Sequence, residues 1–352
     1  MYLPAEWERQ RFVQLTMPHK ESDWSPYLDE VAECYYKMIA AISQYEPVLL
    51  VADDMEYAHR VISDLPNVDI VGCKTNDTWA RDHGFITTKD SCGLVFNDFQ
   101  FNGWGLKFAS DKDNQINRQI WASGILQGSY ANHLDFVLEG GSIESDGRGT
   151  ILTTSSCLLA ENRNNIYSKS EIEEKLCEYL GSDRVLWLDH GYLAGDDTDG
   201  HIDTLARFCD AKTIAYVSCD DPSDEHFEEL AKMKDELMSF TTKDGLPYRL
   251  IALPLPSAIY DGEDRLPATY ANFLIINGAV IYPTYGQSEN DRIAKEILEE
   301  VFPGRDVIGV DCRVLIRQHG SLHCCTMQYP AESLNSKKTY SKMSIDTYSK
   351  KH

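Results

Sequence analysis

The feature that most constrains the fold of this chain is a regular alternation of amphipathic helices with short β-type runs. Apolar residues recur at intervals of three and four in five segments, which we expect to be helices. These segments are 25–45, 111–126, 169–180, 223–240 and 289–301. Ser25 precedes Pro26 and is the expected N-cap of the first helix. Ser170 precedes Glu171 and is the expected N-cap of the third.

Runs of β-branched and other apolar residues lie between these helices. They are 48–51, 68–71, 94–96, 151–154, 185–188, 213–217 and 273–276. Two or three short strands for each helix indicate an α/β chain of about five similar units packed around an axis. No low-complexity linker divides the sequence, so residues 1–352 are expected to form a single domain. Residues 331–352 are expected to form a polar tail rich in Lys and Ser.

The charge balance excludes several classes of partner. The chain has 33 basic and 56 acidic residues, a net charge of -23, which argues against nucleic acid and anionic membranes. The longest apolar stretch, 271–283, is shorter than the roughly 18 residues of a membrane-spanning helix. The N-terminal residues lack the basic and apolar parts of a secretion signal, so a cytoplasmic protein is expected. A small cationic molecule would be attracted to such a chain.

The ten cysteines include no C-x-x-C pair, so the usual spacing of a structural zinc site is missing and reduced thiols are expected. Two segments nevertheless carry candidate functional groups. The first, 76–84, contains Trp79, Arg81 and Asp82, although an Arg–Asp pair beneath a tryptophan could be purely structural. The second, 137–147, places Glu139 before two glycines, which let a backbone come close to a ligand. A hairpin is the alternative there, and Asp146 with Gly147 is read as its turn.

Two further segments are unlike ordinary core or surface. In 195–207, acidic residues surround His201 and Asp203, which would project from one face if the chain were extended from Gly200. A turn that binds a divalent cation and a solvated acidic turn are the alternatives. In 317–328, Cys324 follows a glycine and has histidines nearby, which makes it a candidate nucleophile. Cys325 would face the opposite side of a strand.

Taken together, these groups are a thiol, an imidazole and several carboxylates. Carboxylates can bracket a planar guanidinium, because its N–H donors form a fixed fork. The set therefore indicates nucleophilic attack on a guanidinium carbon.

The same segments resemble a known family. Trp79-Ala80-Arg81-Asp82, the run 138–143, the run 195–203 and His323-Cys324 are similar to segments of the agmatine deiminases, a bacterial and plant branch related to peptidylarginine deiminases. The resemblance extends from about residue 4 to residue 330. It implies a pentein fold, which is a five-bladed pseudosymmetric α/β propeller, and an enzyme that uses neither a metal nor an organic cofactor.

The resemblance also implies roles for individual residues. Cys324 would be the nucleophile and His201 the general acid and base. Asp82 and Asp203 would hold the guanidinium, and Glu139 would orient the histidine. The thiolate would form either with the help of His201 or through the charge of the substrate.

The sequence departs from the family beside the nucleophile, where Gln318 and His319 replace glycines and would narrow the cleft. Trp79 and Arg81, which flank Asp82 in the first segment, are further candidates for substrate binding. Agmatine is the expected substrate, giving N-carbamoylputrescine and ammonia in putrescine and polyamine synthesis. Peptidyl or free arginine is the alternative.

Two other functions are weighed against deimination. A protein that only captures cationic amines would need no thiol, so the presence of Cys324 argues against it. Metal-dependent hydrolysis would use Asp196, Asp197, Asp199 and His201. The number of subunits is left open, with a homo-oligomer among the alternatives.

Overall fold

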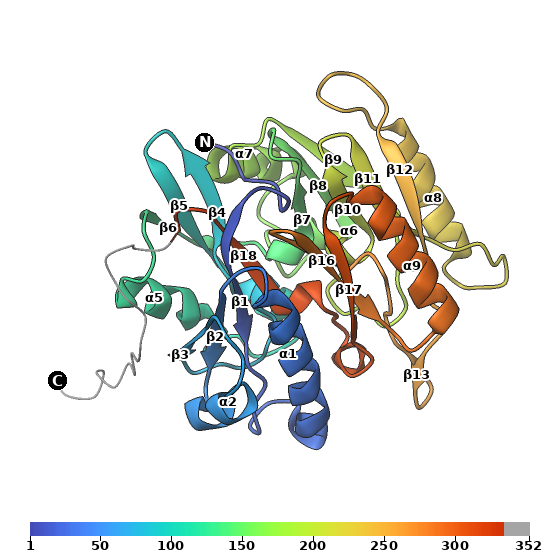
Figure 1. The fold of residues 1–352 in the computed structure, drawn as a ribbon. Coiled ribbons are helices and arrows are strands. Elements are labelled where there is room, and N and C mark those ends of the chain that lie inside the picture. The colour runs from blue at the N-terminus through green and yellow to red at the C-terminus, as the bar shows by residue number, and fades with distance from the viewer. Residues whose placement is uncertain (334–352) are drawn as a thin grey trace.

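The computed structural model describes residues 1–333, so most of the expected tail, 334–352, lies outside the described residues. The described chain has nine helices and eighteen strands in mixed order (Figure 1). The helices are α1 (Leu28–Ile42), α2 (Met55–Val61), α3 (Ala80–His83), α4 (Gly103–Leu106), α5 (Asp113–Ser123), α6 (Ser155–Leu158), α7 (Lys169–Leu180), α8 (Phe227–Ser239) and α9 (Ser288–Val301). The α/β class predicted from the sequence is confirmed.

The strands are short and most are largely buried. They are β1 (Gln10–Thr16), β2 (Val48–Ala52), β3 (Val68–Gly72), β4 (Ile86–Asp90), β5 (Gly93–Gln100), β6 (Ser129–Val137), β7 (Ile143–Ser145), β8 (Thr150–Thr154), β9 (Arg184–Leu188), β10 (Ala206–Asp210), β11 (Thr213–Ser218), β12 (Arg249–Pro254), β13 (Tyr260–Asp261), β14 (Asp264–Arg265), β15 (Leu274–Ile276), β16 (Ala279–Thr284), β17 (Asp306–Asp311) and β18 (Thr326–Pro330). Each run that the sequence analysis expected to be extended lies in one of them, apart from the first residue of 273–276.

Five small sheets repeat one strand order. Their orders are β18-β1-β2-β3, β4-β5-β6, β7-β8-β9, β10-β11-β12 and β15-β16-β17. In each sheet the first two strands are antiparallel and the next pair is parallel. A parallel connection needs a crossover, which α1, α5, α7, α8 and α9 supply in turn. Five similar units are therefore present, as the alternation predicted.

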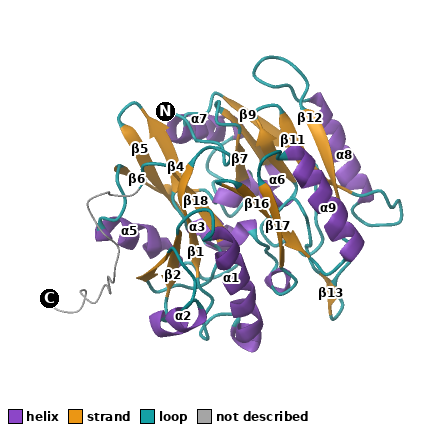
Figure 2. Ribbon diagram, viewed as in Figure 1, coloured by secondary structure: helices purple, strands orange, loops and turns teal. Residues whose placement is uncertain are grey.

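The two ends of the described chain meet in one sheet. β18 pairs antiparallel with β1, and Figure 1 shows these red and blue strands side by side. The long crossover helices lie toward the outside and the strands toward the middle of the molecule (Figure 2). Buried apolar side chains between them form four clusters within the described residues.

Both expected N-caps are wrong. Ser168 caps α7 by accepting a hydrogen bond from the backbone N–H of Glu171, whose carboxylate accepts from Ser168 N–H in return. This capping box defines the helix start more strongly than Ser170, which lies inside the first turn. Ser25 lies inside a 3-10 turn, Ser25–Tyr27, that precedes α1. The predicted helices were otherwise correct to within a few residues at each end.

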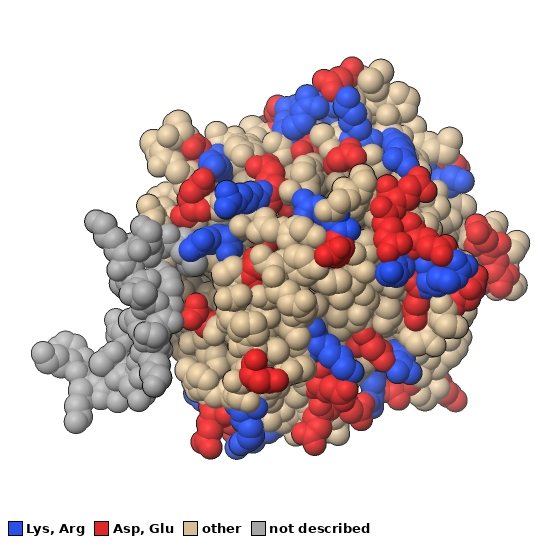
Figure 3. Space-filling view, viewed as in Figure 1, with Lys and Arg blue, Asp and Glu red and all other residues tan. Residues whose placement is uncertain are grey.

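The surface carries both signs of charge. On the face in Figure 3, acidic and basic side chains are interspersed over the visible elements. None of the helices within residues 1–333 is long and apolar enough to cross a membrane.

Candidate active site

The four segments singled out by their sequence meet inside the molecule. Asp82 lies on the single-turn helix α3, and Glu139 immediately precedes a 3-10 turn at Gly140–Ser142. Two more 3-10 turns, Ile202–Thr204 and His323–Cys325, carry the other groups. α3 contacts the turns at Gly140–Ser142 and His323–Cys325, and Gly140–Ser142 contacts Ile202–Thr204. Short turns therefore bring together residues that lie far apart in the sequence.

The local backbone differs from the extended chain expected at two places. His201 and Asp203 flank the first residue of a 3-10 turn, so they do not share a strand face as predicted. His201 faces Asp82 and Glu139, whereas Asp203 faces Cys324. Cys324 and Cys325 likewise lie in a 3-10 turn and not in a strand. Their side chains still diverge, because Cys325 lies against Tyr35.

The Cys324 thiol is buried among polar groups. Its Sγ lies 3.8 Å from Asp203 Oδ2, and Asn272 Nδ2 lies 3.3 Å from the sulfur. Asn272 Oδ1 accepts a hydrogen bond from the backbone N–H of His323 at 2.8 Å, which positions the turn that carries the thiol. Burial raises the pKa of the thiol well above its ordinary value, and the charges of Asp203 and Asp82 raise it further. The thiol is therefore protonated at neutral pH in this structure.

Asp203 presents one free carboxylate oxygen. Its Oδ2 lies 2.7 Å from His323 Nδ1, whereas Oδ1 is buried without a hydrogen-bond partner. Burial alone would raise the pKa of Asp203, but the hydrogen bond and charge of His323 lower it below the ordinary value. A buried acceptor without a partner is costly unless a ligand supplies a donor. Oδ1 is therefore suited to accept from a guanidinium N–H group.

Asp82 is held by two donors. Gly141 N–H donates to its Oδ1 at 3.0 Å, and the Trp104 indole N–H donates to its Oδ2 at 2.9 Å. Burial raises the pKa of Asp82 to about 6, and the charge of His201 acts in the opposite direction. Trp104 has a φ of 54°, in the left-handed region that is unusual for a residue with a side chain. That strain is retained beside the carboxylate, as is common at functional sites.

His201 is a cation between two carboxylates. Its Nδ1 lies 3.6 Å from Asp82 Oδ1 and its Nε2 lies 3.9 Å from Glu139 Oε2. Burial by itself would lower the pKa of His201, but the charge of Asp82, the neighbouring Cys157 and the carboxylate of Glu139 raise it well above the ordinary value. Glu139 is ionised because Arg163 Nε donates to it at 3.0 Å. A protonated His201 can donate a proton but cannot accept one from the thiol.

Gly141 allows the close approach of these groups. A Cβ atom at position 141 would lie 2.6 Å from His201 Nδ1 and 2.8 Å from Asp82 Oδ1. Any side chain there would push the two apart. The functional interpretation of the Gly-Gly pair is therefore favoured over a hairpin at that point. The hairpin does exist further along, where β7 and β8 are joined through the turn at Asp146 and Gly147, as predicted.

A small cavity gives access to the thiol. Its described lining residues are Asp77, Trp79, Asp82, Trp104, Phe108, Asp197, Thr198, Gln318, His319, Gly320 and Cys324. The cavity has about 20 Å³ of free volume, room for about one water molecule. The two side chains expected to narrow the cleft, Gln318 and His319, do line it.

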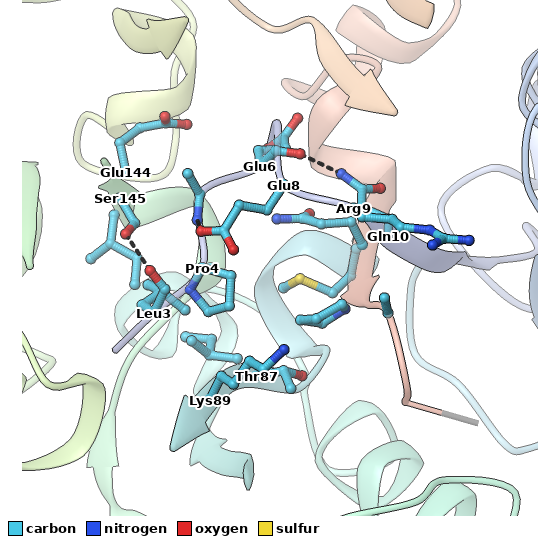
Figure 4. A pocket seen from close by; sticks show the side chains of 18 of the residues that line it. Leu3, Pro4, Glu6, Glu8, Arg9, Gln10, Thr87, Lys89, Glu144 and Ser145 are labelled. Atoms are coloured by element: carbon cyan, nitrogen blue, oxygen red, sulfur yellow. Dashed lines mark hydrogen bonds between the residues drawn. The ribbon is translucent and has the colours of Figure 1, made fainter. Parts of the chain in front are cut away.

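Of the two further substrate-binding candidates, the structure brings only one to this cavity. Trp79 lines it and donates its indole N–H to Asp77 Oδ2 at 3.0 Å. The Arg81 side chain is buried on another side of α3, where its Nη2 lies 3.8 Å from Glu6 Oε2. Arg81 lines a separate cavity of about 220 Å³, formed largely by the N-terminal segment (Figure 4). The two cavities share no lining residue.

The acidic turn before His201 is tied to other parts of the chain. Asp196 accepts hydrogen bonds from the backbone N–H groups of Thr198 and Gly200. Asp199 pairs with Lys107 at 2.7 Å and with Arg163 at 2.6 Å. The solvated-turn alternative therefore does not fit Asp196 and Asp199. Donors and cations of the chain itself contact these two carboxylates, where a divalent cation would otherwise bind.

Two buried groups of three residues within the described chain have ligand atoms close enough to hold a metal ion. They are Glu139, Cys157 and His201, and Glu6, Glu144 and His323. In both groups an arginine already pairs with the carboxylates, Arg163 in the first and Arg207 in the second. A metal ion would have to displace or tolerate that guanidinium, so the charge balance of neither group fits a resident cation.

Several site residues had not been predicted from the sequence. Asn272 beside the thiol, Trp104 on Asp82 and Arg163 on Glu139 act through contacts between distant segments. Among these three residues, Trp104 has a glycine on each side in the sequence, which indicates an unusual backbone conformation there.

Several known proteins resemble this chain over most of its length. Residues 2–330 match the family model of the Porphyromonas-type peptidyl-arginine deiminase. A structure of a Porphyromonas gingivalis protein assigned as an arginine deiminase is 50% identical, with a TM-score of 0.90 over 95% of this chain and 99% of that one. A cysteine-to-serine variant of C. jejuni agmatine deiminase with substrate bound is 42% identical, with a TM-score of 0.87 over 95% and 97% of the two chains.

A relative known by sequence extends the comparison. The Stutzerimonas stutzeri agmatine deiminase is 33% identical over an alignment of 358 positions that covers 94% of this chain and 95% of that protein. The resemblance inferred from the motifs is confirmed over nearly the whole described chain. This chain therefore belongs to the Porphyromonas-type peptidyl-arginine deiminase family.

Proposed function

We propose that this protein is a guanidine deiminase that converts agmatine to N-carbamoylputrescine and ammonia, a step of putrescine synthesis. The observation that carries the proposal is the Cys324 thiol, which lines a cavity with Asp82 and lies 3.8 Å from Asp203, whose second oxygen has no partner. Two carboxylates beside a thiol suit a guanidinium and its central carbon.

In the proposed mechanism, Asp82 and Asp203 hold the guanidinium plane and align its carbon with the sulfur of Cys324, which supplies the proximity effect. The thiol releases its proton to solvent when the substrate binds, because the guanidinium cancels the charges of Asp82 and Asp203 that raise the thiol pKa. Activation by the charge of the substrate is thus favoured over activation by His201.

The carbon–nitrogen bond then breaks with the help of His201. Attack by the Cys324 thiolate forms a carbon–sulfur bond and a tetrahedral adduct. His201 gives its proton to the departing nitrogen, ammonia leaves, and a covalent S-alkylthiouronium remains. The neutral His201 next takes a proton from water, whose oxygen attacks the same carbon. The carbon–sulfur bond breaks, and the ureido product and Cys324 are released.

The lining of the cavity favours agmatine over arginine. Of its described lining residues, three are aspartates and none is lysine or arginine. The α-carboxylate of free arginine would meet negative charge there, whereas the amine of agmatine would be attracted. Burial raises the pKa of Asp197 to about 6, so an ammonium partner would stabilise the ionised form of this carboxylate.

The decisive experiment incubates the purified protein with agmatine, free arginine and a peptide with C-terminal arginine, and measures ammonia and ureido product. We expect turnover of agmatine and a loss of at least about 10³-fold in Cys324→Ser. Cys73→Ser is the matched control, because Cys73 is a buried cysteine that does not line the cavity. Turnover by Cys324→Ser at the native rate would contradict the assignment of the nucleophile.

Deimination of arginine is the second candidate, because the family model and the 50% identical structure both carry arginine in their names. The same panel decides between the two, since turnover of an arginine substrate without turnover of agmatine would select it. Binding of agmatine without turnover would instead indicate the non-catalytic amine-binding protein.

We also propose that the five sheets are arranged as the blades of a pentein propeller within one catalytic domain. Their common strand order and the pairing of β18 with β1 support that arrangement. The cytoplasmic location and the oligomeric state stay predictions.

A further inference from the structure

His323, the residue before the nucleophile, is buried between two carboxylates from distant segments. Its Nδ1 lies 2.7 Å from Asp203 Oδ2, and its Nε2 lies 2.8 Å from Glu6 Oε2. The three residues are at most 8% exposed. A continuous chain of contacts therefore runs from the sulfur of Cys324 through Asp203 and His323 to Glu6.

Glu6 is fixed at the far end of this chain. Arg207 Nη2 donates to Glu6 Oε2 at 2.9 Å, and the backbone N–H of Ile275 donates to Glu6 Oε1 at 2.7 Å. Arg207 in turn pairs with Glu144. Glu6 and Glu144 also line the second cavity, where Figure 4 labels both. The N-terminal segment is thus connected to the active site through one imidazole.

The surrounding charges come from several elements. Those that act on Asp203 are His201, Asp82, Cys324, Arg81 and Arg207, and Arg207 Nη2 also lies 3.0 Å from His323 Nε2. Those that interact with Glu6 are Arg207, Arg81, Glu144, Glu46 and Arg305. Among these basic groups and His323, the imidazole of His323 is the one that contacts the Asp203 carboxylate directly.

We propose that His323 and Glu6 are positioning residues for deimination, which hold the Asp203 carboxylate ionised and oriented with Oδ1 free for the guanidinium. This inference rests on the proposed function. Glu6 acts through His323, because it contacts the imidazole and no contact joins it to Asp203 or Cys324.

The physical reason is the cost of a buried charge. A carboxylate buried without a cationic or hydrogen-bonding partner becomes protonated. The hydrogen bond and charge of His323 offset burial and lower the pKa of Asp203. A protonated Asp203 would attract the guanidinium less and would be free to rotate. If His323 is replaced, the affinity of the site for the guanidinium should therefore fall, and the fall should be largest at low pH.

The test measures kcat and KM for agmatine from pH 5.5 to 9 in the full-length wild type, His323→Asn, Glu6→Gln and the double variant. In His323→Asn we expect the protonation of Asp203 to add to that of Asp82, so that the acid limb of kcat/KM moves up in pH and becomes steeper, with an extra loss of up to about tenfold at pH below the limb. The loss of kcat/KM should come mainly from a higher KM, and it should become smaller toward pH 9. Glu6→Gln should shift the same limb in the same direction by less.

The double variant tests whether Glu6 acts through the imidazole. We expect its kcat/KM to be no lower than that of His323→Asn alone, because the loss of the imidazole already separates Glu6 from Asp203. Glu8→Gln is the matched control, since Glu8 lines the same cavity but accepts from Tyr2 Oη and Ala5 N–H and does not contact His323. Its pH profile should equal that of the wild type.

Three results would overturn the inference. They are an unchanged acid limb in Glu6→Gln and His323→Asn, a loss that is the same at every pH, or a double variant with additive losses. If circular dichroism shows that His323→Asn does not fold, the test is the position of the acid limb of kcat/KM in Glu6→Gln compared with the wild type. If the wild type turns over no guanidine substrate, the proposed function fails first and this inference falls with it.

Discussion

At the residue scale, the proposed role of Asp82 in holding the guanidinium predicts a pH dependence of substrate capture. Because burial raises its pKa to about 6, the carboxylate is ionised at neutral pH and is protonated as the pH falls through 6. We expect kcat/KM for agmatine to fall on the acid side with an apparent pKa near 6, whereas kcat should fall at lower pH, since bound guanidinium keeps the carboxylate ionised. A profile of kcat/KM that is flat between pH 5 and 7 would contradict this assignment.

Removing the charge of Asp82 should be costly. In Asp82→Asn the guanidinium loses one buried carboxylate, for which we expect a loss of about 2–4 kcal/mol, or roughly 30- to 1,000-fold in kcat/KM. The acid limb near pH 6 should disappear or weaken in this variant. Asp64→Asn is a suitable control, because Asp64 is an exposed carboxylate that accepts from Tyr36 Oη. Steady-state kinetics on both variants checks the prediction.

Gly141 is needed for its missing side chain. Gly141→Ala would place a Cβ 2.6 Å from His201 Nδ1 and 2.8 Å from Asp82 Oδ1. We expect a loss of at least about 100-fold in kcat and about 1–3 kcal/mol in the free energy of unfolding from overpacking. In Gly72→Ala the new Cβ meets the flexible side chain of Met55 at 3.3 Å, so activity should be close to native. Native activity in Gly141→Ala would show that the two groups need not be so close.

At the scale of elements, the beginning of α7 separates two serines that look equivalent in the sequence. Ser168 makes the capping box with Glu171, whereas Ser170 lies in the first turn. Ser168→Ala should therefore lower the free energy of unfolding by about 1 kcal/mol, and Ser170→Ala should change it by less than about 0.5 kcal/mol. Urea unfolding of the two variants measures both values. An equal effect of the two substitutions would contradict the observed cap.

The accuracy of the element predictions follows from the length of each pattern. α7 matched its predicted range 169–180 because several turns of amphipathic sequence average out single exceptions. Strands such as β7, with three residues, are too short to show alternation, and none was predicted there. An extended chain was one of the alternatives at Ile202–Thr204, and a strand was expected at His323–Cys325, because a single 3-10 turn has no periodicity that distinguishes it from a strand.

At the scale of the whole molecule, the net charge of -23 should attract a dication over a distance. Raising the ionic strength from about 20 to 300 mM should lower kcat/KM for agmatine by roughly 3- to 10-fold, because salt screens long-range attraction. The kcat/KM for butylguanidine, which has one positive charge, should fall by less over the same range of ionic strength. Initial rates at low substrate concentration measure both dependences. An equal salt dependence for the two substrates would show that the overall field does not contribute.

Local sequence was enough to predict the α/β class, the repeated units and the residue types of the chemistry. Hydrophobic periodicity and the motifs around Asp82, His201 and Cys324 are properties of short segments, and short segments can be read without knowing their neighbours. Arg81 shows what such a short segment does not predict, which is the direction of a side chain. It is adjacent to Asp82 in the sequence, yet its side chain lies on another side of α3 and lines the second cavity.

Only the tertiary structure decided which groups touch. The contact of His323 with Glu6, the support of Asp82 by Trp104 and the place of Asn272 beside the thiol each join segments that are distant along the chain. Such contacts depend on how the five sheets pack, and one residue type can serve many partners. The charge state of each buried group follows in turn from those contacts, because a pKa responds to burial and to neighbouring charge, which a sequence does not contain.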